Sequence, residues 1–155
     1  MREAACLAVT EVYSRIAPEY NREAFRAAVP DFALALGEKL AKGAGDTAYG
    51  VRVQACLALG HIAKLYASDL EEAFGAEEMA SVYSDCWLAR LADPVASVRE
   101  AAAIALIQCL PVLPAPLLDS LRDYISTNLL KAKDPSPSWE LSDGCLYLVR
   151  ELASA

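Results

Sequence analysis

The sequence predicts an all-α protein made of stacked helical hairpins, because three of its segments resemble one another. They read MREAACLAV, VRVQACLALG and VREAAAIALI, and their arginines Arg2, Arg52 and Arg99 are 50 and 47 residues apart. Self-similarity at a period of roughly 20–50 residues is typical of repeat architectures. No run alternates apolar and polar residues between turn residues, as a strand would. The 155 residues fit a single repeat domain, 1–155.

Each copy has the apolar spacing of a helix. In the second copy, residues at offsets 0, +4, +7, +8 and +11 lie on one side of a helix and form a core stripe: Val51, Ala55, Ala58, Leu59 and Ile62. Small residues beside the stripe, such as Cys56, Gly60 and Ala103, let neighbouring helices approach closely. A fourth, degraded copy runs from Leu141 to Leu152, with Ser142 in place of the arginine.

The segments between the copies are predicted to be the first helices of the hairpins. They are expected at 19–42, 76–92 and 115–131, and Pro30 is expected to kink the first of them. The repeats then lie at about 19–68, 75–111 and 114–153, after a lone second helix at 1–17. Neither end has the polar capping unit that repeat arrays usually carry. We therefore expect a piece of a longer array, or ends that a larger complex covers.

The stretch DPVASVREAAAIAL, from Asp93 to Leu106, resembles the HEAT repeat, and DTAYGVRVQACLALG, from Asp46 to Gly60, resembles it with two substitutions. The resemblance implies a right-handed, armadillo-like α-solenoid of about three and a half repeats. It also implies that aspartate and arginine form a ladder of hydrogen bonds between adjacent repeats. This structural role falls on Asp46, Arg52, Asp93 and Arg99. Asp134-Pro135 repeats the Asp93-Pro94 turn, but no arginine follows at the matching position.

Charge and cysteine content restrict the partners and the compartment. The net charge is −7, and the densest basic group is Lys131 with Lys133, so neither nucleic acid nor an anionic membrane is expected as a partner. The apolar residues form helical faces rather than a membrane span. Five cysteines occur singly, without a C-x-x-C pair, which favours a reducing, cytoplasmic location.

Few residues are candidates for catalysis or for cofactor binding. His61 is the only histidine, so a multi-histidine metal site is excluded. Cys86 beside Trp87 is interpreted as an inert core thiol, and Gly43 and Gly45 do not form a phosphate loop. We therefore expect no catalytic residue, no metal and no cofactor. An enzyme or lyase subunit on a HEAT-like scaffold is an alternative that rests on the resemblance alone.

One repeated apolar position is not explained by the core stripe. Six residues after the first stripe residue the copies hold Leu7, Leu57, Ile104 and Tyr147, about 240° round the helix from its start. We call these four residues the concave row, because second helices line the concave side of HEAT-like stacks. The flanking positions supply what we call the acidic rim: Glu3, Glu11, Glu100, Asp143 and Glu151.

Apolar surface rimmed by polar groups usually marks an interface. The sequence therefore predicts a protein-interaction scaffold that binds a partner on its concave row, such as a basic amphipathic helix or peptide. Two alternatives stay open. A loop or neighbouring segment could cover the row as ordinary core, and the chain could be a purely architectural part of a larger assembly.

Overall fold

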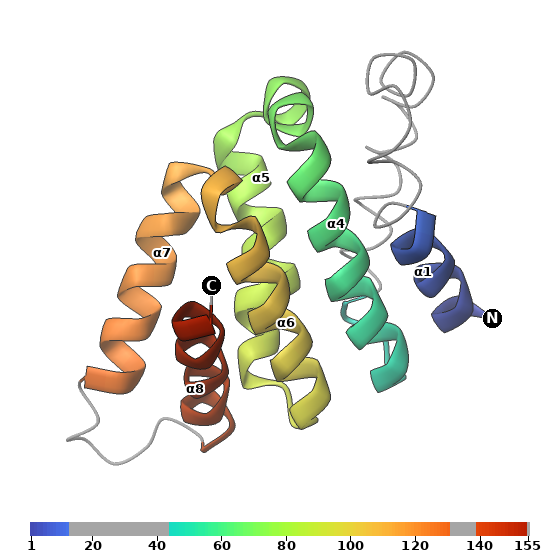
Figure 1. Ribbon diagram of the computed structural model, residues 1–155. Helices are drawn as coiled ribbons and strands as arrows, with labels where there is room; N and C mark the ends of the chain where they lie inside the picture. Colours follow the sequence, from blue (N-terminus) through green and yellow to red (C-terminus); the bar gives the residue numbers. More distant parts are fainter. Residues whose placement is uncertain (13–43, 131–138, 155) are drawn as a thin grey trace.

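The computed structural model of the chain describes residues 1–12, 44–130 and 139–154, and in these residues all regular structure is helical (Figure 1). Its α-helices are α1 (Arg2–Glu11), α4 (Tyr49–Phe74), α5 (Ala76–Tyr83), α6 (Ala96–Cys109), α7 (Ala115–Ile125) and α8 (Trp139–Ser154). Short π and 3₁₀ turns extend them: η2 (Ser84–Leu88), η3 (Ala89–Ala92), η4 (Leu110–Val112) and η5 (Ser126–Leu130). The predicted helix at 19–42 and the Asp134-Pro135 turn lie outside the described residues.

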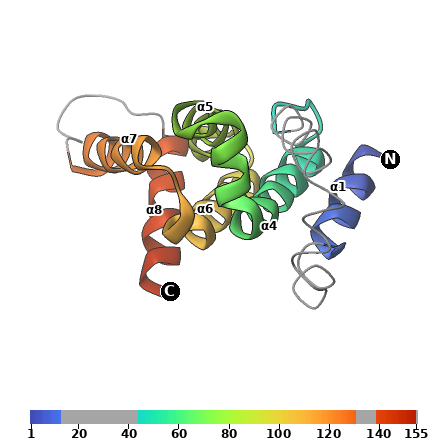
Figure 2. The same ribbon diagram turned by 90° about the horizontal axis from the view of Figure 1, so that it is seen from above.

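The helices form two layers, as the two perpendicular views show (Figures 1 and 2). In one layer α1 packs on α4, α4 on α6, and α6 on α8. In the other layer α5 packs on α7. Second helices of the predicted hairpins thus lie side by side with second helices, and first helices with first helices. This arrangement is consistent with an α-solenoid.

The first helices begin and end close to where the sequence predicts. The helical path through α5, η2 and η3 covers 76–92, and that through α7 and η5 covers 115–130. Pro114 and Pro116 stand at the start of α7, where a proline costs no hydrogen bond. The inward side of the first path is buried: Met79, Tyr83, Cys86, Trp87 and Leu91.

Helix α4 runs further than the sequence indicates. The repeat predicted at about 19–68 includes most of α4, which continues to Phe74 after a kink at Tyr66, whose φ is −124° and ψ 21°. Leu70, on the extension, is buried in the core. Gly75 then ends the helix with a φ of 86°, a conformation that suits glycine, and donates its N–H to the carbonyl of Glu71 at 2.8 Å.

The core lies between the two layers, and Trp87 is its largest fully buried side chain. Its ring stacks on Tyr83 with the centroids 4.7 Å apart, and its indole N–H donates to the carbonyl oxygen of Cys56 at 3.2 Å. A buried indole N–H needs such a partner. Trp87 therefore joins the first helix of one hairpin to α4 of the preceding one.

Glycines set the closest approaches between helices. A Cβ at Gly60 would lie 3.1 Å from the Cβ of Ala105, so the predicted close packing at Gly60 is present between α4 and α6. Cys109 uses the same proximity and donates its thiol to the carbonyl of Gly60 at 3.1 Å. A Cβ at Gly144 of α8 would overlap the backbone carbonyl of Leu91. Gly144 is thus required where α8 meets the end of η3.

Alanine substitutions at two helical glycines should have opposite effects. A methyl at Gly144 meets rigid backbone, so Gly144→Ala should lower the free energy of unfolding by about 1–3 kcal/mol. A methyl at Gly50 meets only the carboxylate of Glu3, at 2.6 Å, which can move aside. Gly50→Ala should therefore be neutral or stabilise by up to about 1 kcal/mol. Urea unfolding followed by circular dichroism measures both, and equal effects would contradict the packing of α8 on Leu91.

Candidate functional site

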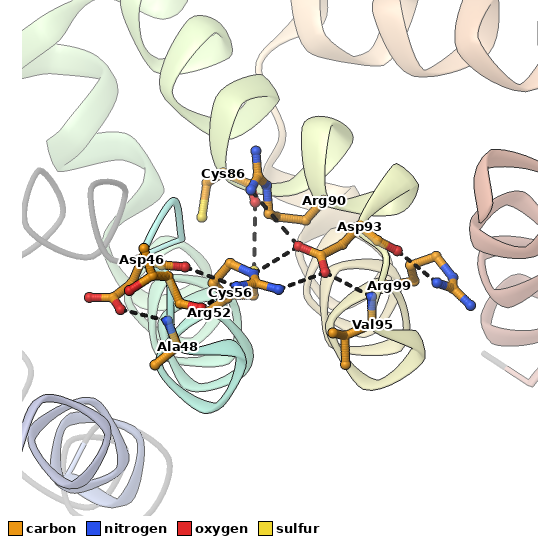
Figure 3. Close-up of polar contacts among 10 residues, drawn as sticks. Asp46, Ala48, Arg52, Cys56, Cys86, Arg90, Asp93, Val95 and Arg99 are labelled. Atoms are coloured by element: carbon orange, nitrogen blue, oxygen red, sulfur yellow. Dashed lines mark hydrogen bonds and ion pairs between the residues drawn. The ribbon is translucent and has the colours of Figure 1, made fainter. Parts of the chain in front are cut away.

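A ladder of arginine and aspartate side chains connects the second helices (Figure 3). Arg52 of α4 donates from Nε and Nη2 to the two carboxylate oxygens of Asp93, at 2.8 and 2.9 Å. Its Nη1 donates to the backbone carbonyls of Asp46 and Thr47, at 2.9 and 3.2 Å. Arg52 and Asp93 are both buried. The bidentate pair is therefore largely dry and joins one repeat to the next.

The aspartates also shape the turns that precede the second helices. Asp93 accepts from the backbone N–H of Val95 at 3.0 Å, and Asp46 accepts from that of Ala48 at 2.9 Å. An aspartate that bonds the backbone two residues later stabilises a turn. Each carboxylate therefore fixes the entry to its own helix and also pairs with the arginine of the preceding repeat, Asp93 with Arg52 and Asp46 with Arg2.

Arg99 continues the ladder to α8 with an aspartate that the sequence places elsewhere. Its Nε and Nη2 both donate to one oxygen of Asp143, at 2.9 and 2.6 Å, and its Nη1 donates to the carbonyl of Asp93 at 2.7 Å. The guanidinium also lies 5.0 Å from the ring centroid of Trp139. Asp143, assigned from the sequence to the acidic rim, is thus engaged in the ladder. An aspartate inside a helix gives no turn signal, so spacing alone could not find it.

The first pair of the ladder, Arg2 with Asp46, is more exposed to solvent than the pairs that follow it. Arg2 of α1 forms an ion pair with Asp46 at 2.9 Å and donates from Nη2 to it at 3.2 Å, but the side chain of Arg2 is 70% exposed, whereas that of Arg99 is 2% exposed. An exposed ion pair is screened by water and contributes about 0–1 kcal/mol. Arg99 is buried but its partner Asp143 is 36% exposed, so loss of this pair leaves the carboxylate partly hydrated and costs about 1.5–3 kcal/mol.

Because Arg99 is buried and Arg2 is exposed, alanine at Arg99 should lower the free energy of unfolding more than alanine at Arg2. Arg99→Ala should lower the free energy of unfolding by about 1.5–3 kcal/mol, since it removes a buried guanidinium that bonds Asp143 and the carbonyl of Asp93. Arg2→Ala, the matched control, should cost no more than about 1 kcal/mol. At about 2–4 °C per kcal/mol the melting temperatures by circular dichroism separate the two. Unchanged melting of Arg99→Ala would show that this arginine has no structural role.

The concave row is open to solvent to different degrees. Leu7 is exposed, and Leu57, Ile104 and Tyr147 are half-buried. Leu57 and Tyr147 contact the core with part of their surface. All four belong to the layer of α1, α4, α6 and α8. No residue of the row is fully buried, although full burial is what its alternative interpretation as core requires.

The acidic rim is unevenly available. Glu100 and Glu151 each accept from Nη2 of Arg150 at 2.7 Å, so these two carboxylates already hold a basic side chain. Glu3 lies against Gly50, at the contact of α1 with α4, and Glu11 is exposed. With Asp143 in the ladder, the rim carboxylates Glu100, Asp143 and Glu151 pair with arginines of this chain.

An open groove of about 490 Å³ lies in the other layer, where sequence reasoning placed no site. It is formed between η2 and η3 on one side and α7 and η5 on the other, and Asp85 and Asp123 face it across an apolar floor that includes Leu88. The hydroxyl of Tyr124 is buried there without a hydrogen-bond partner among the described residues, and burial raises its pKa to about 12. Its residues come from two repeats, so no local pattern could reveal it.

The cysteines and the histidine have the properties of structural residues. A side-chain hydrogen bond with Cys56 and burial raise the pKa of Cys86 well above its usual value. Burial raises the pKa of Cys109 to about 12 and that of Cys145 to about 11, so these thiols stay protonated at neutral pH. Burial, with a smaller contribution from Lys64, lowers the pKa of His61. None of these thiols is activated as a nucleophile.

The described ranges 1–12, 44–130 and 139–154 hold neither a candidate metal site nor a candidate membrane span. These residues contain no group of three or more histidine, cysteine, aspartate or glutamate side chains placed to hold a metal ion. None of their helices combines the length and the apolar character needed to cross a bilayer.

The thiol environments predict both reactivity and pH dependence. With Ellman's reagent at pH 8, only the half-buried Cys6 should react quickly, and all five thiols should react in guanidinium chloride. Because the folded pKa values of Cys109 and Cys145 lie above the unfolded value of about 9, the unfolded chain loses these protons first. The free energy of unfolding should therefore fall between pH 9 and 12. Rapid labelling of Cys86 in the folded chain would contradict its burial.

Comparison with known proteins supports one family. The model of the HEAT repeat matches residues 85–113, which comprise the end of the first-helix path, α6 and η4. Neither the curated proteins nor the solved structures give a match to this chain. HEAT repeats stack into curved arrays whose concave surfaces generally bind other proteins. The resemblance read from Asp93 to Leu106 is thus supported, because the HEAT-repeat match at residues 85–113 includes this stretch.

Proposed function

We propose that the chain is a right-handed α-solenoid scaffold of about three and a half HEAT-type repeats, which binds a protein partner on its concave row. The repeats are a second helix at 1–17 and hairpins at about 19–68, 75–111 and 114–153. The observation that carries the proposal is the partial exposure of Leu7, Leu57, Ile104 and Tyr147, one from each of four adjacent second helices.

The energetic argument concerns what the fold requires at this position. The core stripes of α4 and α6 are buried without the row residues, so apolar side chains in the row are not needed to form the hairpins. Partly exposed apolar side chains at equivalent sites of successive helices favour an interface. Such a row fits the apolar face of an amphipathic helix, whose anchors repeat every three or four residues.

Electrostatics favours a basic partner. The chain has a net charge of −7, and carboxylates stand beside the row in α1, α6 and α8. Rim charges mainly raise the association rate and make it sensitive to salt, whereas the buried apolar contacts carry the affinity. We place this interaction in the cytoplasm, on the basis of the unpaired cysteines. The proposal involves no catalysis, because HEAT repeats typically act as scaffolds.

One observation favours the second candidate, a purely architectural segment. Helix α8 exposes apolar side chains away from the row: Trp139, Leu146, Val149 and Leu152. A neighbouring repeat or subunit would bury such a face. No geometry among the described residues supports the third candidate, an enzyme or lyase subunit.

Paired variants separate the first two candidates. Leu57→Ser with Ile104→Ser should leave the helical signal and melting nearly unchanged and weaken partner binding about 100-fold or more, since interface anchors are often worth about 2 kcal/mol each. Leu146→Ser with Val149→Ser is the matched control and should bind within a few-fold of the parent chain. The partner is first identified by affinity purification of the full-length protein and then titrated by calorimetry.

The two double variants give different results for the scaffold and the architectural candidates. If only the Leu146 and Val149 pair abolishes binding, the chain uses its α8 face and the architectural candidate stands. If the Leu57 and Ile104 pair melts many degrees lower, the row is core and the site assignment is wrong.

A further inference from the structure

The C-terminal end of the concave row already holds a guanidinium group. Arg150 lies over the ring of Tyr147 with its central carbon 4.9 Å from the ring centroid. Its Nη2 donates to Glu100 of α6 and to Glu151 of α8, each at 2.7 Å, and its Nε donates to Glu151 at 2.9 Å. One aromatic face and two carboxylates therefore surround this side chain.

This combination is the chemistry that recognises arginine. A planar guanidinium stacks on an aromatic ring and presents donors in a fork that carboxylates accept. Charged acceptors on either side of the ring strengthen these bonds. A lysine, with its compact ammonium group, would use the same site less well. The contacts thus define an arginine site made by Tyr147, Glu100 and Glu151.

Arg99 provides an internal comparison, because it also pairs a carboxylate with an aromatic ring, in Asp143 and Trp139. The Arg99 side chain is 2% exposed, so its guanidinium cannot be exchanged from solvent, although Asp143 and Trp139 are themselves partly open. By contrast, the side chains of Arg150 and Glu100 are 49% and 41% exposed. Ion pairs this exposed contribute little to stability, so the bonds of Arg150 can be exchanged for others at small cost.

We propose that Tyr147, Glu100 and Glu151 form an arginine-binding subsite at the end of the concave row. Arg150 fills the subsite in the unbound chain and leaves it when an arginine of the partner protein enters. This inference rests on the proposed function, because the row brings the partner to the subsite. Arg150 then competes with the partner's arginine for the subsite. The partner must therefore carry an arginine, and a lysine would not replace it fully.

Competition predicts that removing Arg150 uncovers the subsite. Arg150→Gln keeps a side chain of similar reach but no charge. In ¹⁵N NMR titrations with N-acetylarginine amide, this variant should give saturable shifts at Tyr147, Glu100 and Glu151. The parent chain should bind the same probe at least tenfold more weakly, because its own guanidinium is always present nearby. N-acetylcitrulline amide, which is isosteric but uncharged, is the control probe and should bind neither protein.

A second substitution tests the composition of the subsite. Arg150→Gln combined with Tyr147→Leu should lose the response to the arginine probe while keeping the circular-dichroism spectrum. Arg150→Lys should respond less than Arg150→Gln, since its ammonium still occupies the carboxylates. If Arg150→Gln melts lower and shows no saturable shifts, Arg150 is only a tie between α6 and α8. Equal affinity of the parent chain and Arg150→Gln for the probe would also overturn the inference.

Failure of the arginine subsite can be distinguished from failure of the proposed concave-row interface. The small probe needs only the subsite, so its binding to Arg150→Gln is independent of Leu57 and Ile104. Loss of the proposed row would appear as unchanged partner affinity in the Leu57 and Ile104 double variant, with probe binding intact. With a purified partner, Arg150→Gln should bind severalfold more tightly than the parent chain, and replacing the partner's arginine by lysine should remove that gain. Weaker binding by Arg150→Gln would contradict displacement.

Discussion

The buried pair of Arg52 and Asp93 is the contact on which the stacking of the helices depends. Placing two charges in a dry interface is costly, and the cost is met only if nearly every donor and acceptor is bonded. Arg52 satisfies this condition with four hydrogen bonds to Asp93, Asp46 and Thr47. A shift of α4 along α6 would break several of these bonds together. The pair therefore fixes the register of adjacent repeats more than it adds net stability.

The same ladder explains why the stability of the chain differs along its length. Repeat proteins are stabilised by contacts between neighbouring units, so each interface has its own strength. At the α4–α6 and α6–α8 contacts the arginine is buried, and Gly60 adds a close approach of α4 to α6. Helix α1 has no buried residue in the described structure, and its Arg2 pair is exposed. Local opening of the described part should begin at α1.

Local signals predicted the helices well and long-range contacts poorly. The path 76–92 follows from Gly75, the apolar spacing and the Asp93-Pro94 turn, which are all readable in sequence. The kink at Tyr66 is not readable, because it depends on packing rather than on proline or glycine. The bonds of Arg99 to Asp143 and of Arg150 to Glu100 join residues 44 and 50 positions apart. No repeat pattern marks these partners, since each bond links non-equivalent positions.

Burial, rather than residue type, distinguishes the structural arginine contact on α8, that of Arg99, from the proposed binding contact, that of Arg150. Its two arginine contacts use the same three chemical parts: a guanidinium, an aromatic ring and a carboxylate. The Arg99 guanidinium beside Trp139 is 2% exposed, so water reaches it poorly and a broken bond there would leave its charge incompletely solvated. At Tyr147 water can replace each bond as it breaks, and the arginine can be exchanged without unfolding the helix. One set of interactions can therefore hold α8 in place at Arg99 and leave the proposed arginine subsite at Tyr147 adaptable.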